Sequence, residues 1–147
     1  MATTLSADRP APRYTPHELI AAFAVSCILG GLLTDLAYWK SAEFLWADFS
    51  AWLVSASVVA MVVALVAALI DYLIFRSRRR MPRLSYLAVG LVVLVLATFN
   101  MMIHSRDAWT SVVPWGLTLS AVTVLVLLAA AIWRTVELRR ACREVQP

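Results

Sequence analysis

The chain has 147 residues, of which 62% are hydrophobic and 15% charged, against roughly 25% charged in soluble proteins. A soluble domain of this length buries only about 70% of its unfolded surface, which leaves too little interior for so many apolar side chains. The composition, the net charge of +4 and the two cysteines therefore argue against a soluble globule, a disordered chain and a secreted disulfide scaffold. They favour an integral membrane protein.

We predict a disordered cytoplasmic N-terminus over residues 1–16, which contain three prolines. Four apolar stretches follow, each close to the 20 or so residues that a helix needs to cross a bilayer. Because lipid offers no hydrogen-bond partner to the backbone, each stretch should be helical. The sequence thus predicts an all-α, integral membrane, antiparallel four-helix bundle over residues 17–133, with spans at about 19–38, 51–75, 84–103 and 112–133.

Two segments outside these spans have recognisable patterns. Between the first two spans, Trp39, Trp46 and Phe49 recur at near-helical spacing, which predicts a short helix on the outer membrane surface, with a plain loop as the alternative. Residues 134–147 are expected to form a basic cytoplasmic tail in which the last helix continues for some turns. Its basic face would suit anionic lipid headgroups.

The distribution of positive charge predicts the orientation. Eleven of the 13 basic residues flank the spans on one side, and the other side carries only Lys40 and Arg106. By the positive-inside rule, both termini and the arginine-rich connection at 76–83 are cytoplasmic. We therefore expect a multi-pass protein of a bacterial inner membrane.

Small residues at every fourth position predict where the helices pack closely. The second span repeats alanine at 60, 64 and 68, beside Ala67, and we expect it to contact a similar ridge on the first span. That ridge consists of Ala22, Ser26, Gly30 and Thr34. Ser120 and Thr123 of the last span are expected to form hydrogen bonds across the bundle.

Polar residues in the membrane are the usual indicators of function, and one set lies at the outer ends of the spans. This outer set contains Asp35, Tyr38, Asn100, His104 and Asp107, and Arg106 is adjacent to it. Asn100, His104 and Asp107 share a helix face, because they stand at i, i+4 and i+7. We predict that the Asp35 carboxylate pairs with His104 or Arg106, since an acid near a helix C-terminus requires a cation or a proton.

A second, inner set contains His17, Glu18 and Asp71, and we predict that Asp71 pairs with His17 or Arg134. The preferred interpretation of both sets is structural pairing between helix ends. The alternative is a proton or ion relay that uses Asp35, Asp71 and His104.

The residues do not predict a cofactor, a metal, a nucleic-acid site or a catalytic group. A haem with two histidine ligands would need both at one depth, whereas His17 and His104 are expected on opposite sides of the membrane. A metal held by Asp35, His104 and Asp107 is a weaker alternative, because these residues form no compact ligand motif. Cys27 and Cys142 lie at different depths and should not form a disulfide.

The order of these residues resembles the family of predicted membrane proteins called domain of unknown function 2231, from about Pro16 to Ile132. The positions that carry the resemblance are His17, Asp35 and Tyr38 in TDLAYW, Trp52-Leu53, Asp71-Tyr72, Asn100, Arg106, and the GLTLS of Gly116 to Ser120. The chain departs from the family pattern at the start of the third span, where Leu84 and Ser85 replace a histidine. It departs again at Ala68, which stands in the place of a glycine.

The resemblance implies the architecture and the membrane location, and it implies no reaction. We therefore expect a non-enzymatic accessory or scaffold subunit whose partners are the lipid bilayer and other membrane proteins or a second copy of the chain. The alternative is a small transporter or a proton-coupled redox component of the membrane.

Overall fold

The computed structural model describes residues 15–75, 84–106 and 112–144. The predictions for residues 1–14, for the arginines of 76–83 and for Asp107 lie outside the described residues. Within them the chain forms four helices: α1 (Pro16–Ser41), α2 (Phe44–Phe75), α3 (Leu84–His104) and α5 (Trp115–Glu144). Each is long and apolar enough to cross a membrane, so the prediction of an all-α protein with four spans is confirmed.

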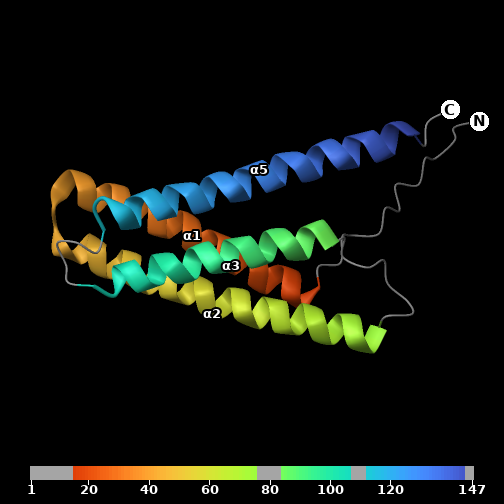
Figure 1. The fold of residues 1–147 in the computed structure, drawn as a ribbon, viewed down its shortest axis with the longest axis horizontal. Coiled ribbons are helices and arrows are strands. Elements are labelled where there is room, and N and C mark those ends of the chain that lie inside the picture. Colours follow the sequence, from red (N-terminus) through yellow and green to blue (C-terminus); the bar gives the residue numbers. More distant parts are fainter. Residues whose placement is uncertain (1–14, 76–83, 107–111, 145–147) are drawn as a thin grey trace, which may run out of the picture.

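The helices run up, down, up and down, as an antiparallel bundle requires (Figure 1). Each helix packs mainly on two neighbours, in the pairs α1–α2, α2–α3, α3–α5 and α1–α5. The start of α1 and the end of α5 therefore lie at the same end of the bundle (Figure 1). The opposite end, where α1 turns into α2, is called the outer end below, following the predicted orientation.

Helix α1 begins and ends with local hydrogen bonds that its sequence supplies. At its start, the Thr15 backbone N–H donates to Glu18 Oε2 at 2.9 Å, and Pro16 occupies the first helical position, where no N–H is needed. At its end, Ala42 adopts a left-handed conformation with φ 53°, and its N–H donates to the Tyr38 carbonyl at 2.8 Å.

The predicted surface helix or loop between the first two spans is wrong. Helix α2 already begins at Phe44, so that only Ala42 and Glu43 connect it to α1. Trp39 belongs to the last turn of α1, whereas Trp46 and Phe49 lie in the first turns of α2, where their rings are 6.3 Å apart. Burial of Ala47 in the same turns ties the segment to the bundle.

The predicted contact between α1 and α2 is confirmed for Ala60, Ala64 and Gly30 and is wrong for Ala22 and Ser26. Ala60 and Ala64 of α2 are buried, as expected. On α1, however, Ala22 and Ser26 are exposed, and the buried stripe runs through Ala24, Cys27, Ile28, Gly31, Asp35 and Tyr38. The face was misassigned because α1 is apolar on all sides, so hydropathy does not distinguish its inner face from its lipid face.

Glycines allow the α1 and α2 backbones to approach each other. A Cβ atom at Gly31 would lie 3.2 Å from Val54 Cγ2, and one at Gly30 would lie 3.2 Å from Leu53 Cδ1. These distances are tighter than ordinary carbon contacts, which lie near 3.5–4.0 Å. The glycine pair therefore sets how closely the two helices pack near the outer end.

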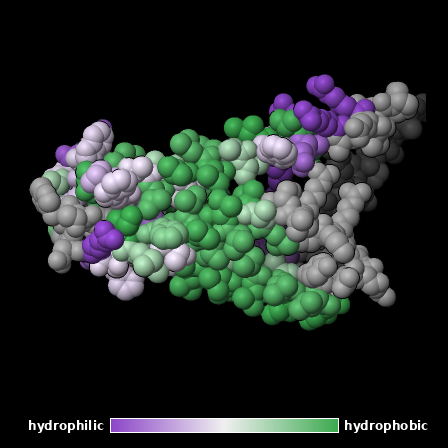
Figure 2. Space-filling view, in the orientation of Figure 1, coloured by the Kyte–Doolittle hydropathy of each residue, from purple (hydrophilic) through white to green (hydrophobic). Residues whose placement is uncertain are grey.

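The interior and the surface are both rich in apolar side chains. Ile28, Val93 and Val124 form a buried cluster between α1, α3 and α5. The middle of the face in Figure 2 is almost wholly hydrophobic, whereas hydrophilic residues gather at the outer end and along the far end of α5. Helix α5 continues to Glu144, which confirms that the last helix extends into the basic tail.

Candidate functional site

The Asp35 carboxylate lies inside the bundle, one and a half turns before the end of α1. It is 0% exposed and is the only buried carboxylate among the residues whose side chains the structure describes. Its position follows from the helical repeat, because Asp35 stands four residues after Gly31 on the buried stripe of α1. A charge in such a place requires hydrogen-bond donors from its neighbours.

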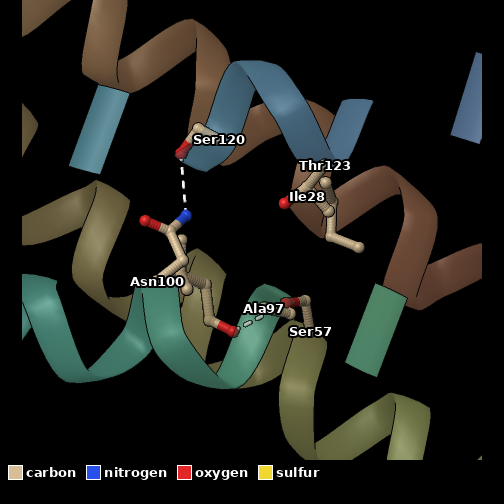
Figure 3. A pocket seen from close by; sticks show the side chains of 7 residues that line it. Ile28, Ser57, Ala97, Asn100, Ser120 and Thr123 are labelled. Carbon is tan, nitrogen blue, oxygen red and sulfur yellow. Dashed lines mark hydrogen bonds between the residues drawn. The ribbon is translucent and has the colours of Figure 1, made fainter. Parts of the chain in front are cut away.

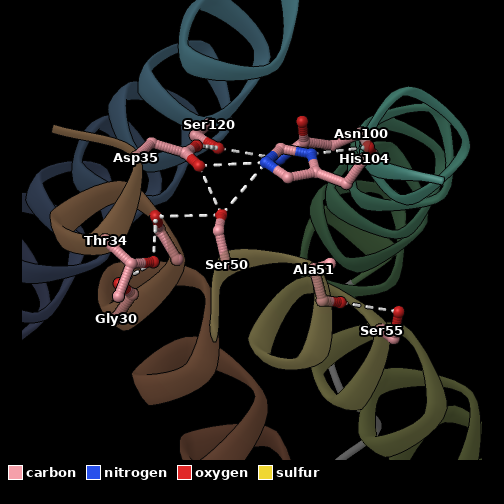
Figure 4. Close-up of polar contacts among 10 residues, drawn as sticks. Gly30, Thr34, Asp35, Ser50, Ala51, Ser55, Asn100, His104 and Ser120 are labelled. Carbon is pink, nitrogen blue, oxygen red and sulfur yellow. Dashed lines mark hydrogen bonds and ion pairs between the residues drawn. The ribbon is translucent and has the colours of Figure 1, made fainter. Parts of the chain in front are cut away.

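Each of the other three helices supplies one of those donors (Figure 4). Ser50 of α2 donates its hydroxyl to Asp35 Oδ1, and Ser120 of α5 donates to Asp35 Oδ2 at 2.5 Å. His104, the last residue of α3, places Nε2 2.9 Å from Asp35 Oδ1. Of the two partners predicted for Asp35, His104 is therefore confirmed, and the Arg106 side chain is exposed.

The partners of His104 determine where its hydrogens lie. Nδ1 is 2.9 Å from the Asn100 backbone carbonyl, which only accepts, so Nδ1 carries a hydrogen. Nε2 faces the Asp35 carboxylate and, at 3.0 Å, the oxygen of Ser50, whose hydrogen already points to Asp35. A proton must therefore lie in the hydrogen bond between Asp35 and His104, and the pair as a whole is neutral.

Asn100 extends the network one turn deeper into the bundle. Its Nδ2 donates to Ser120 Oγ at 2.8 Å, and Ser120 can accept because its own hydrogen goes to Asp35. This arrangement fixes the orientation of the amide. Asn100 Oδ1 is then left buried, without a hydrogen-bond partner among the described residues.

The residue types Ser50, His104 and Asp35 occur in hydrolase triads, but their geometry differs from that of a triad. In a triad the carboxylate binds Nδ1 and the nucleophile binds Nε2, on opposite sides of the imidazole ring. Here both groups meet Nε2, and Nδ1 faces the backbone of its own helix. All three side chains are also buried, which leaves no room for an acyl substrate beside the hydroxyl.

Two other predicted polar positions, Tyr38 and His17, lie on α1. Tyr38 is buried and packs with Ala47 and Val112 at the outer end. His17 lies at the other end of α1, where its Nε2 is 3.1 Å from Thr15 Oγ1. The side chain of Asp71 lies outside the described residues, so its predicted pairing with His17 or Arg134 stays a prediction.

The inner and outer sets are widely separated. Ser50 and Asp71 are 21 residues apart on the continuous helix α2, which corresponds to about 32 Å of helix. His17 and His104 likewise lie at opposite ends of the bundle, so that a single haem could not take both as ligands (Figure 1). Among the described residues, no group of three or more His, Cys, Asp or Glu side chains is placed to hold a metal.

The sequence predicts that Ser120 forms a hydrogen bond across the bundle, but it does not identify Ser50 as a polar residue of the site. Ser120 bonds across the bundle as predicted, whereas Thr123 donates within its own helix to the Leu119 carbonyl at 2.7 Å. A signal for Ser50 was present, because the small residues of the second span continue upstream at spacings of three and four. The buried residues of this stripe are Ala47, Ser50, Val54, Ser57, Ala60 and Ala64.

Comparison with known proteins identifies the family. No curated protein and no solved structure matches the chain. The family model described as "Predicted membrane protein (DUF2231)" matches residues 14–136, which include the first three spans, most of the fourth and the whole Asp35 network. This protein therefore belongs to the domain of unknown function 2231 family of membrane proteins.

Proposed function

We propose that this protein is a non-enzymatic accessory or scaffold subunit of a bacterial inner membrane. The proposal rests on one observation: Ser50, His104 and Ser120 together form hydrogen bonds to both carboxylate oxygens of Asp35. Its carboxylate oxygens accept hydrogen bonds from three other helices, so the buried polar chemistry of the outer end serves to hold the bundle together. A rigid bundle with this small a polar part is suited to binding other membrane proteins rather than to transforming a substrate.

The proposed orientation places both termini in the cytoplasm. It is supported by the eleven basic residues that flank one side of the spans. The start of α1 and the end of α5, which these charges adjoin, lie together at one end of the bundle (Figure 1). Labelling of single cysteines placed at residue 2 and at residue 43 would test this orientation. A membrane-impermeant thiol reagent added to intact cells should reach position 43 and not position 2.

The surfaces open to partners are the apolar outer faces of the helices. Each helix presents at least one large exposed side chain in its membrane segment, such as Leu33, Val63, Phe99 and Leu125. If only lipid contacts these faces, a larger apolar side chain should be tolerated on each of them, because acyl chains can move to make room. If a partner protein packs on one of these faces, a larger side chain there should weaken its binding, since a packed interface resists added volume.

Tryptophan scanning with quantitative co-purification tests the scaffold role. The tagged full chain and its Leu33→Trp, Val63→Trp, Phe99→Trp and Leu125→Trp variants would be expressed at native level, extracted in lipid nanodiscs and analysed by mass spectrometry. We expect defined membrane proteins, or a second copy of the chain, to co-purify with the unmodified chain. Substitution on one face should abolish this co-purification while the stability of the bundle is unchanged. Equal behaviour of all four variants, or isolation of a lone monomer, would contradict the proposal.

The shared proton of Asp35 and His104 favours one second candidate, a proton-coupled transport or redox function. The separation of Asp71 from Ser50 along α2 weighs against a relay across the whole membrane. Proteoliposomes that contain a trapped pH-sensitive dye would distinguish the two candidates. Proton flux in the wild type that is lost in Asp35→Asn, or a Soret band or bound quinone in the purified protein, would support the second candidate over the scaffold.

A further inference from the structure

A small cavity lies beside Asn100, between the Asp35 network and the apolar middle of the bundle. It measures about 10 Å³ and is lined by Ile28, Val54, Ser57, Ala97, Asn100, Ser120 and Thr123. All of these residues are at most 5% exposed. The volume is at the lower end of the roughly 10–15 Å³ that a cavity needs to hold one water molecule. Figure 3 shows that the side chains around it come from all four helices.

Apart from the second Nδ2 hydrogen of Asn100, the polar groups that line this cavity are left as acceptors. Ser57 donates its only hydroxyl hydrogen to the Val54 carbonyl, and Thr123 donates its own to the Leu119 carbonyl. Ser120 has likewise committed its hydrogen to Asp35. Asn100 Oδ1 completes the set as a buried acceptor with no partner among the described residues. A ligand for this cavity must therefore be small and must donate hydrogen bonds.

We propose that one water molecule is a permanent part of the structure in this cavity. It donates one hydrogen to Asn100 Oδ1 and the other to a hydroxyl oxygen of Ser57 or Thr123. The water continues the hydrogen-bonded chain from Asp35 through Ser120 and Asn100 into the middle of the bundle. There the chain meets the buried cluster of Ile28, Val93 and Val124, which offers no further polar group. The hydrogen-bonded chain therefore ends at this apolar cluster and does not continue toward the inner end of the bundle.

A small cation is the other ligand that a cavity rich in acceptors would bind. The charge balance favours water, because the nearest carboxylate, Asp35, is already neutralised by the proton that it shares with His104. An added cation would remain uncompensated in a low-dielectric site.

Crystallography of the full chain from a lipid mesophase, at a resolution that shows ordered water, tests the proposal. We expect one density peak within hydrogen-bond distance of Asn100 Oδ1, about 2.7–3.1 Å. Crystals soaked in thallium acetate should show no anomalous signal at that peak. Absence of the peak, rotation of the Asn100 amide onto a protein donor, or a thallium signal would overturn the proposal.

Substitution of a lining residue provides the matched comparison. Ala97→Val adds two methyl groups to the cavity wall and should abolish the peak, whereas Ala64→Val adds the same volume at a buried position that does not line the cavity and should retain it. Ser57→Ala is the second variant, since the Ser57 hydroxyl bonds only to its own helix and its loss should leave the fold intact. It should lower the occupancy of the water. Full occupancy in Ala97→Val would show that the peak does not depend on this cavity.

Discussion

His104 Nε2 lies 2.9 Å from Asp35 Oδ1, although 69 residues separate the two positions in the chain. The contact joins α1 to α3, which are not neighbours around the bundle. Ser50 and Ser120, from the two helices in between, bond to the same carboxylate. One neutral buried pair thus connects all four helices at a single level.

Because the two side chains share one proton and one hydrogen bond, loss of either leaves the other buried without its partner, and the two losses should be strongly non-additive. We expect Asp35→Asn or His104→Ala alone to lower the free energy of unfolding by roughly 3–5 kcal/mol, as for other buried pairs from which one partner is removed. The double variant should lose less than the sum of the two. Reversible unfolding by sodium dodecyl sulfate in mixed micelles measures these values. Additive losses would show that the two side chains do not interact.

Two serines of α2 offer a controlled test of the hydrogen bonds to Asp35 (Figure 4). Ser50→Ala removes a buried donor to a carboxylate and should destabilise the bundle by about 1–3 kcal/mol. Ser55 donates only to the Ala51 carbonyl in its own helix, so Ser55→Ala should change stability by no more than about 0.5 kcal/mol. Thermal unfolding in the same detergent compares them. Equal shifts in Tm would count against a special role for Ser50.

The glycines of α1 and α3 should respond oppositely to the same substitution. A Cβ at Gly31 meets Val54, so that Gly31→Val should force α1 and α2 apart at a cost of about 1–3 kcal/mol. A Cβ at Gly90 meets nothing within 4 Å, and Gly90→Val should be neutral or stabilising by up to about 0.5 kcal/mol. Unfolding in mixed micelles gives both values. A stable Gly31→Val variant would contradict the close contact of α1 with α2.

The end of α1 offers a stabilising substitution. Ala42 adopts a left-handed conformation that a side chain disfavours, whereas glycine adopts it freely. Ala42→Gly should therefore raise the free energy of unfolding by roughly 0.5–1 kcal/mol, after the greater flexibility of glycine in the unfolded chain is counted. The control is Ala37→Gly, inside α1, which should destabilise by about 1 kcal/mol. A rise in Tm for the first and a fall for the second, measured by circular dichroism, are the expected results.

Much of this architecture could be predicted from the sequence, because transfer into lipid depends on local composition. Some 20 consecutive apolar residues specify a membrane helix regardless of what surrounds it. The four spans, the all-α class and the continuation of α5 into the tail follow from this local rule and are confirmed. The pairing of Asp35 with His104 was also accessible, since both lie at the outer ends of their spans and a buried acid requires a partner.

Only the tertiary structure decided which face of each helix turns inward. In water an apolar stripe identifies the buried side of a helix, but in a membrane the lipid side is equally apolar, and the signal disappears. For this reason the prediction placed Ala22 and Ser26 on the inner face of α1, where the structure buries Ala24 and Cys27, and it did not include Ser50. Its place beside Asp35 depends on the register of two packed helices, which no local property of the chain encodes.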